Sequence, residues 1–341
     1  MTEALERALA DALAHLLTAA GTRGDGASDP DGAVRWTEHT ARVLQRLEPA
    51  DRRRLSGLFH DTARREPEGA RRAALLRLPE SLGLTGGAHA AYCDGVQDHM
   101  ARFVAAVRGA DPATPVPTCP GWTLADLARH VGEVHRWMEH LVRTRAPARV
   151  EVEDVPLDLP GDPAAYPAWL ARGTDAVLRA LRAAHPDTPM WSYGADPHVR
   201  FYPRRLFFET AVHLADVELA LGAEPLIAPG TAADGIEEFL ENLPYYGWVA
   251  EPTSRLGRDG ATLRLRAADT GGVWTLTLGG GGFAWRADGD DPTGTGATVT
   301  VEAGCGELLL LLYGRYGAGE RRFTVTGDRA LLDAWLAATR F

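Results

Sequence analysis

The sequence contains few cysteines and no long apolar run, and each shortage excludes a class of protein. Cysteine occurs three times in 341 residues, as Cys93, Cys119 and Cys305, which lie far apart and form no CxxC pair. This spacing supports neither a disulfide framework nor a cysteine-based zinc site. The chain also lacks the run of about 18 apolar residues that a membrane-spanning helix requires, so we expect no membrane partner.

The chain also has fewer basic than acidic side chains. The formal net charge at pH 7 is -10, whereas a protein that binds nucleic acid non-specifically needs concentrated basic side chains. We therefore expect no nucleic-acid partner. The first residues, MTEALERALADALAHLL, lack the basic start, continuous apolar stretch and small-residue cleavage site of a secretion signal. Together with the sparse cysteines, this predicts a cytoplasmic protein.

The composition and periodicity of the sequence change along the chain and divide it into three zones. These zones predict a multidomain protein of α and α+β structure. Residues 1–86 are rich in alanine, leucine and arginine with helical periodicity, and they predict a small N-terminal helical module. Residues 87–250 predict a four-helix bundle, and residues 251–341 predict a small α+β domain. The N-terminal module offers little chemistry, and we expect it to stabilise the protein or to contact a protein partner or a second subunit.

The middle zone shows helical periodicity in four segments that proline-rich connections separate. The segments are residues 89–109, 123–142, 163–184 and 203–221. The connections are long enough for crossovers, so the sequence leaves the order of the helices in the bundle open. Thr123 followed by Asp126 matches a capping box and predicts a helix that begins at Leu124.

The third zone changes to short alternating or β-branched segments between glycine- and aspartate-rich turns. These segments predict strands at residues 262–267, 273–278, 283–287, 297–303 and 322–327. Residues 306–317 and 328–341 are helical by length and composition. We expect a mainly antiparallel sheet covered by these two helices.

The segment FFETAVHLADVELALG, residues 207–222, combines a largely apolar circumference with ionisable groups, three of which share one face. Glu209, His213 and Asp216 are spaced i, i+4 and i+7, which places them on one face of a helix. Because the rest of the helix is apolar nearly all round, this face should point into the bundle. Ionisable groups in a dry interior need compensation. A mutual hydrogen bond, a cation from another helix or a bound metal would each supply it.

A partner for this face is expected on the helix that begins at Leu124. His130 and His135 lie at the two edges of its apolar stripe, so either could reach the interior. Beside Glu209 and His213, His130 is the natural third metal ligand. Two imidazoles and one carboxylate suit Zn(II), Fe(II) or Ni(II), and three protein ligands leave open positions for water or substrate.

Asp216, one turn beyond His213, admits two interpretations. It would orient the imidazole of His213 through a hydrogen bond to the second ring nitrogen. Alternatively, it would form a salt bridge on the helix surface.

Three segments carry a recognisable family pattern. They are VPTCPGWTLADLARHVGEVHRW, FFETAVHLAD, and ATVTVEAGCGELLLLLYGR followed by FTVTGDRALLDAWL. In their order and intervals, these segments resemble the mycothiol-dependent maleylpyruvate isomerase family over about residues 89–341. The resemblance implies a DinB-like four-helix metal-binding domain joined to a small α+β domain of sterol-carrier-like type. It also implies a divalent metal, usually zinc, on His130, Glu209 and His213, with mycothiol as the thiol cosubstrate.

The chain departs from the family pattern at two positions and matches it at a third. Family members often carry histidine before the ligand glutamate and arginine after the second ligand histidine, whereas this chain has Phe208 and Leu214. We expect a more apolar inner wall, which favours a bulky or hydrophobic electrophile over a small dianion. Arg315 matches the family arginine in LLLLLYGR. It would bind an anionic substrate or thiol carboxylate, or else interact with the end of its own helix.

The sequence thus predicts a metal-dependent enzyme that uses a low-molecular-weight thiol as nucleophile. Coordination to a divalent cation would deprotonate the thiol, for cis-trans isomerisation or S-transfer on a small electrophilic metabolite. Arg315 and Asp216 are the candidate catalytic residues. The alternatives are a metal-water hydrolase with Glu209 or Asp216 as base, and a non-catalytic binding or regulatory protein with a vestigial metal site.

Overall fold

The computed structural model describes residues 9–14, 16, 39–41, 43–44, 47, 49–67, 70–82, 84, 86–288 and 296–340. The chain divides into two compact units, Met1–Ala91 and Tyr92–Phe341. Much of the predicted N-terminal module before residue 49, and Phe341 at the end of the last predicted helix, lie outside the described residues. Within the described ranges, no helix is long and apolar enough to cross a membrane.

The described part of the first unit is helical, as predicted. Helix α3 (Pro49–Arg65) packs against α4 (Ala70–Ser81). A cluster of buried apolar side chains forms the core of this unit: Ala10, Ala14, Phe59, Ala63, Leu75, Leu78, Leu82 and Leu84. The module therefore has a hydrophobic core of its own.

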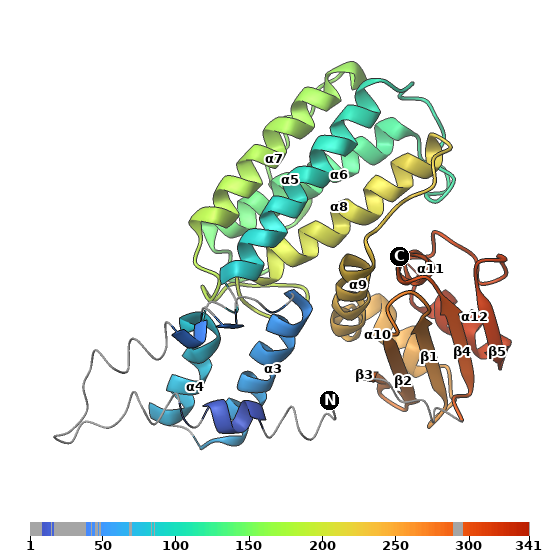
Figure 1. Cartoon of the computed structure of the whole chain (residues 1–341). Coiled ribbons are helices and arrows are strands. Elements are labelled where there is room, and N and C mark those ends of the chain that lie inside the picture. The colour runs from blue at the N-terminus through green and yellow to red at the C-terminus, as the bar shows by residue number, and fades with distance from the viewer. Residues whose placement is uncertain are drawn as a thin grey trace. The chain divides into compact units, whose positions relative to one another are not determined.

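Four long helices account for most of residues 86–220, all of which are described (Figure 1). They are α5 (Gly86–Arg108), α6 (Leu124–Thr144), α7 (Tyr166–Ala183) and α8 (Phe201–Ala220), with short 3-10 helices at Val152–Asp154 and Pro163–Ala165. α6 packs along both α7 and α8, and the apolar faces of the bundle meet in one core. The helices match the four predicted segments to within a few residues.

Helix α6 begins where the sequence predicts. The Thr123 hydroxyl accepts the backbone N–H of Asp126, and the Asp126 carboxylate accepts the backbone N–H of Thr123. This reciprocal pair is a capping box, which satisfies two N–H groups that the first turn of a helix leaves unpaired. It anchors the start of the helix that carries His130 to the loop before it.

The second part of the larger unit contains a five-stranded sheet. Its strands are β1 (Thr262–Ala267), β2 (Val273–Gly279), β3 (Gly282–Asp288), β4 (Val299–Ala303) and β5 (Thr324–Gly327), in the order β3-β2-β1-β4-β5. β1 and β4 pair in parallel, whereas the other neighbours are antiparallel. Leu263 and Leu265 of β1 are buried and alternate with the more exposed Arg264 and Arg266. One face of this mainly antiparallel sheet is therefore packed, which is the predicted α+β arrangement.

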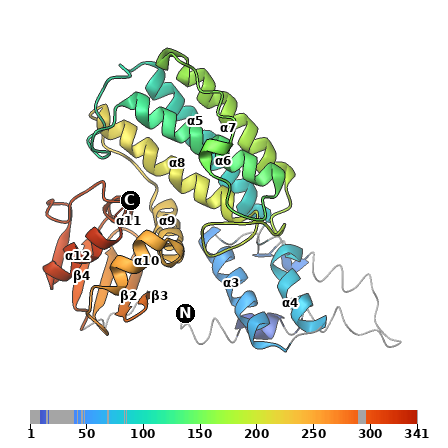
Figure 2. The ribbon, with the colours of Figure 1, turned by 180° about the vertical axis from the view of Figure 1, so that it is seen from behind.

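More helices than the two predicted line the described core of this sheet. Besides α11 (Cys305–Leu312) and α12 (Arg329–Ala338), they include α9 (Pro229–Asn242) and α10 (Gly247–Ser254). α9 precedes the predicted boundary at residue 250 and α10 spans it, yet their buried apolar residues belong to the core of the sheet. α9 contacts both α8 and α11, so it joins the bundle to the sheet (Figures 1 and 2).

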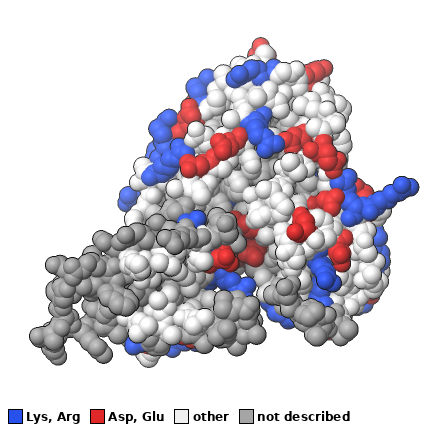
Figure 3. Space-filling view, in the orientation of Figure 1, with Lys and Arg blue, Asp and Glu red and all other residues white. Residues whose placement is uncertain are grey.

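Acidic and basic side chains are interspersed over the described surface that Figure 3 shows. Many pair one turn apart on a helix, such as Arg143 with Glu139 at 2.8 Å and Arg329 with Asp333 at 3.0 Å. Nucleic-acid binding proteins instead gather their basic side chains on one face. On the described part of this face, basic and acidic side chains lie side by side.

The packing of α6 on α7 can be tested at Gly132. A Cβ on Gly132 would lie 2.0 Å from the ring of Trp169, which is fully buried. Gly132→Ala is therefore expected to lower the free energy of unfolding by about 1–3 kcal/mol through overpacking, although alanine normally stabilises a helix relative to glycine. The control is Gly230→Ala in α9, where an added Cβ meets nothing within 4 Å. Urea titration should show loss only for Gly132→Ala, and equal stability of the two variants would contradict the predicted overlap.

Candidate metal centre

Helix α8 carries a polar stripe into the interior of the larger unit. Arg205, Glu209, His213 and Asp216 follow one another at intervals of about one turn on a helix that is otherwise buried by apolar residues. The side chain of Asp216 is fully buried and that of His213 is 9% exposed. The side chain of Glu209 is 22% exposed. The face predicted from the i, i+4, i+7 spacing therefore points inward, and it begins one turn earlier than predicted.

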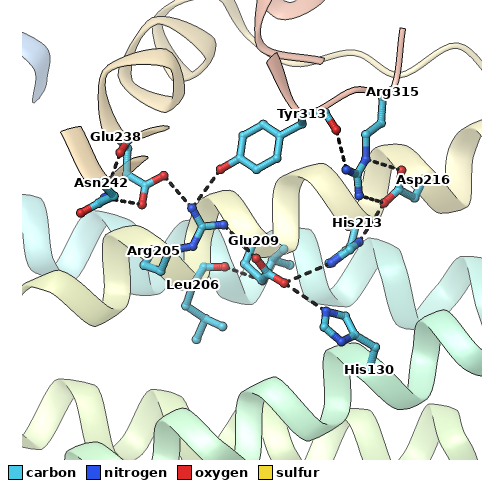
Figure 4. Close-up of polar contacts among 11 residues, drawn as sticks. His130, Arg205, Leu206, Glu209, His213, Asp216, Glu238, Asn242, Tyr313 and Arg315 are labelled. Carbon is cyan, nitrogen blue, oxygen red and sulfur yellow. Dashed lines mark hydrogen bonds and ion pairs between the residues drawn. The ribbon is translucent and has the colours of Figure 1, made fainter. Parts of the chain in front are cut away.

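Glu209 brings two histidines together (Figure 4). Its Oε1 lies 3.2 Å from Nε2 of His130 on α6 and 3.1 Å from Nε2 of His213 on α8. The two imidazole rings have their centroids 5.0 Å apart and lie nearly perpendicular. One potential ligand atom from each residue lies within 4.8 Å of the other two. These residues, here called the trio, form a candidate three-ligand metal site.

The donor set of the trio suits a divalent ion of the zinc type. Two imidazole nitrogens and one carboxylate oxygen are ligands that Zn²⁺, Fe²⁺ and Ni²⁺ accept. Zinc bonds of about 2.0–2.2 Å in a tetrahedron place neighbouring ligand atoms roughly 3.3 Å apart. The separations of 3.1 and 3.2 Å between Glu209 and the imidazoles are close to this value. The side chain of His130 is 34% exposed, so one side of the trio is open to solvent.

Asp216 orients the ring of His213. Its Oδ2 lies 2.8 Å from His213 Nδ1. The Nδ1–H donated to this carboxylate fixes the ring with Nε2 facing Glu209, and Nε2 would release its proton to bind an ion. Because Asp216 is fully buried, the alternative of a salt bridge on the helix surface is not what the structure shows.

Arg315, in the C-terminal part of the larger unit, forms an ion pair with Asp216. Its Nε and Nη2 donate to Oδ1 and Oδ2 of Asp216 at 2.9 and 2.8 Å, and its Nη1 donates to the Tyr313 carbonyl at 2.7 Å. The Thr118 hydroxyl donates to Oδ1 of the same carboxylate at 2.6 Å. The Arg315 side chain is only 7% exposed. The arginine that the sequence assigned to an anionic substrate or a helix end is thus engaged with Asp216.

The electrostatics of the cluster favour charged carboxylates. Burial opposes ionisation, but hydrogen bonds from His130 and His213 and the charge of Arg205 hold the pKa of Glu209 well below its usual range. Hydrogen bonds from His213 and Arg315 likewise outweigh burial and keep the pKa of Asp216 well below its usual range. Burial lowers the pKa of His213, but hydrogen bonds to Asp216 and Glu209 prevail and raise it to about 9. The position between these two carboxylates therefore favours positive charge.

Cys119, His213 and Asp216 form a second group of close donors in the described part of the chain. Asp216 in this group is already paired with the buried guanidinium of Arg315, which an incoming cation would have to displace. Burial and the negative charge of Asp216 raise the pKa of Cys119 to about 11, whereas a metal ligand must be a thiolate. The trio is therefore the better candidate for a metal.

Two family models match the chain. The model described as the mycothiol maleylpyruvate isomerase N-terminal domain matches residues 93–218, and the MDMPI C-terminal domain matches residues 231–334. The chain belongs to the mycothiol-dependent maleylpyruvate isomerase family. The resemblance noted in the sequence is thereby confirmed. The trio lies within the N-terminal family domain, and Arg315 lies within the C-terminal family domain.

Two similar solved structures are crystal structures of a mycothiol-dependent maleylpyruvate isomerase. One is 14% identical, with a TM-score of 0.47, and covers 70% of this chain and 94% of that chain. The other, a histidine-to-alanine variant, is 13% identical at the same coverage, with a TM-score of 0.48. A UbiJ-SCP2 ubiquinone synthesis protein is 19% identical over 33% of this chain and 93% of its own, with a TM-score of 0.25. The search of curated proteins gave no match.

The two positions where this chain departs from the isomerase family pattern do not line the trio. Phe208 is fully buried against the rings of Tyr92 and Phe207. Leu214 lines a separate cavity of about 160 Å³ formed with α5 and the segment before α9. Neighbours of a ligand in sequence point about 100° away from it on a helix. The prediction that these two residues form an apolar inner wall is therefore wrong.

His135, the other histidine considered on α6, lies away from Glu209. Its Nδ1 is 3.3 Å from the Thr174 hydroxyl of α7, and its side chain is buried. Burial and the charge of Arg136 lower the pKa of His135 to about 3, so the ring is neutral. α6 therefore presents His130 to the stripe on α8.

The sequence interpretation missed three residues of this isomerase-family site. Arg205 Nη2 donates to Glu209 Oε2 at 2.8 Å, and its position four residues before Glu209 could have revealed it by the same periodicity. Thr118 and Cys119 lie in the loop before α6, nearly 100 residues from Asp216 in the chain. Both lie in the family segment VPTCPGW, but nothing in that segment indicates a contact with α8, because only the fold brings this loop to Asp216.

Proposed function

We propose that this chain is a metal-dependent enzyme that uses a mycothiol-like thiol to isomerise a small electrophilic metabolite. His130, Glu209 and His213 are the proposed ligands of one divalent metal ion, most simply Zn²⁺. The observation that carries the proposal is the convergence of these three donors at a partly exposed position. Membership of the mycothiol-dependent isomerase family supports the thiol and the reaction class.

Each residue of the cluster has a proposed task. The trio binds the ion, which when bound lowers the pKa of a coordinated thiol so that the nucleophilic thiolate is available near neutral pH. Asp216 holds the Nδ1 proton of His213 and so keeps Nε2 available. Arg315 in turn holds both oxygens of Asp216. We assign Asp216 and Arg315 as positioning residues, because they act through His213 and do not face the open side of the trio.

The proposed reaction needs no reagent besides the thiol. A thiolate adds to one carbon of a conjugated cis double bond, and the electron pair moves onto the conjugated carbonyl. Rotation about the resulting single bond and elimination of the thiolate restore the double bond in the trans geometry. The thiol is therefore regenerated in each turnover. In S-transfer, by contrast, the thiol would remain bonded to the product.

The proposal is tested by metal analysis combined with a thiol titration. Element-resolved mass spectrometry of the purified protein should find a stoichiometric divalent metal. Conversion of maleylpyruvate or a related cis-configured acid should require mycothiol, which is recovered unchanged. His213→Ala should lose both metal and activity, whereas His140→Ala, away from the trio on α6, should keep both.

The alternatives predict different results in the same assays. Activity undiminished without thiol would replace isomerisation by metal-water hydrolysis. A thiol adduct that accumulates in proportion to turnover would indicate S-transfer. A protein that binds neither metal nor thiol would favour a non-catalytic role.

The family matches begin at residue 93 and lend no support to a contact of the N-terminal module. Its contact with a protein partner or a second subunit stays a prediction, as does the cytoplasmic location.

A further inference from the structure

Arg205 lies one turn before Glu209 on α8 and contacts groups on two sides of the site (Figure 4). Its Nη2 donates to Glu209 Oε2 at 2.8 Å. Its Nη1 donates to Glu238 Oε2 on α9 at 2.7 Å and to the hydroxyl of Tyr313 at 2.9 Å. The Arg205 side chain is 7% exposed. One buried guanidinium thus links a proposed metal ligand to the C-terminal part of the unit.

The two oxygens of Glu209 have different partners because of this contact. Oε2 accepts from Arg205, whereas Oε1 faces the Nε2 atoms of His130 and His213. A carboxylate held in this way cannot rotate freely, and it offers one oxygen to the histidine side. Without Arg205, both oxygens would be free to turn toward an ion. The guanidinium therefore determines how Glu209 can coordinate.

Arg205 is itself held firmly by buried groups. Glu238 is 1% exposed, and its other oxygen, Oε1, accepts from Asn242 Nδ2 at 3.0 Å. Tyr313 follows the end of α11 and is also buried. Because the planar guanidinium donates in fixed directions, fixing Nη1 between Glu238 and Tyr313 also fixes the direction of Nη2. The orientation of Glu209 is thus set from the C-terminal part of the unit.

We propose that Arg205 is a positioning residue that makes Glu209 a one-oxygen ligand and couples metal affinity to α9 and to Tyr313. This inference rests on the proposed metal site. It goes beyond that site because it assigns control of a ligand on the bundle to residues of the C-terminal part. Loss of such an outer contact typically lowers metal affinity by about 10- to 100-fold.

The test is a charge-balanced double variant, Arg205→Gln with Glu238→Gln, which removes one buried positive and one buried negative charge together. Two quantities are measured: the Zn²⁺ dissociation constant by competition with a chromophoric chelator, and the visible absorption of the Co²⁺-loaded protein. We expect the affinity to fall by about 10- to 100-fold and the Co²⁺ band to change as Glu209 gains freedom. A role in stability alone would leave the Co²⁺ spectrum as it is.

Two matched controls isolate the contact with Glu209. Glu238→Gln alone leaves Arg205 on Glu209 but removes one of the two groups that fix the direction of its guanidinium, so the affinity should fall by less than in the double variant. Arg204→Gln removes a neighbouring arginine of α8 that pairs with Asp234 and Glu241 of α9, and it should leave both affinity and spectrum unchanged.

The outcomes separate this inference from the proposed function. If the unaltered protein binds no metal, the proposed function fails. If it binds metal and the double variant has the same affinity and spectrum, only the role of Arg205 is overturned. Should the double variant not fold, Arg205→Lys serves instead. The single ammonium of lysine cannot donate to Glu209, Glu238 and Tyr313 at once as the guanidinium does. Unchanged affinity and spectrum in that variant would therefore equally overturn the proposal.

Discussion

Glu209→Gln is expected to remove the bound metal and to lower thiol-dependent kcat/KM by more than about 100-fold, since loss of even an outer contact costs about 10- to 100-fold. Oε1 of Glu209 faces both histidines of the trio, so the substitution changes the one donor that the two imidazoles share. Glutamine keeps the size of the side chain but supplies no anionic oxygen. Metal content by mass spectrometry and kcat/KM with mycothiol measure the effect.

Glu218 provides a matched control on the same helix. Its side chain is 21% exposed, close to the 22% of Glu209, and it pairs with Arg102 at 2.6 Å. Glu218→Gln removes a carboxylate of similar exposure from α8 without touching the trio, and it should keep both metal and activity. A Glu209→Gln protein that behaves in the same way would show that the ion binds elsewhere.

Arg315→Met is expected to lower the free energy of unfolding by about 3–5 kcal/mol, because removal of one partner of a buried ion pair leaves an uncompensated charge. Asp216 is fully buried, and Arg315 supplies two of its hydrogen bonds. Methionine has a similar reach but cannot donate. Chemical denaturation of the full chain measures the loss, and metal content should fall with it because Asp216 orients His213.

Two further variants test whether the effect comes from the buried charge. Arg322→Met breaks ion pairs with the more exposed Glu224 and Glu320, and it should cost less than about 1 kcal/mol. Combining Arg315→Met with Asp216→Asn removes both charges and should recover most of the lost stability. If Arg315→Met is as mild as Arg322→Met, the buried pair contributes little to stability.

Elements with a strong local pattern could be predicted from the sequence. The capping box at Thr123 places the start of α6 at Leu124, and the alternation of TLRLRA places β1 at Thr262–Ala267. α9 was missed because Pro229 and Gly230 weaken its local signal. Its packing supplies what the local pattern lacks: a Cβ on Gly235 would lie 2.9 Å from side-chain atoms of Phe208 and Leu309.

The candidate site was predictable where one helix carries it. Glu209, His213 and Asp216 share a face because helical periodicity places them there, whatever packs against α8. The sequence allowed either His130 or His135 to reach the interior, since each lies at an edge of the same stripe, and favoured His130 as the third ligand. The structure distinguishes them, because His130 lies 3.2 Å from Glu209 and His135 contacts Thr174.

By itself, the sequence determined the family, the main helices and strands, and the inward stripe on α8. These follow from periodicity, caps and motifs, which act over a few residues of backbone. Only the tertiary structure decided that Arg315 reaches Asp216 from 99 residues away and that Thr118 reaches it from 98 residues away. It also decided that Arg205 donates both to Glu209 and to Glu238 of α9. Such contacts depend on how separate helices pack, and a buried charge accepts whichever partner that packing brings within hydrogen-bond distance.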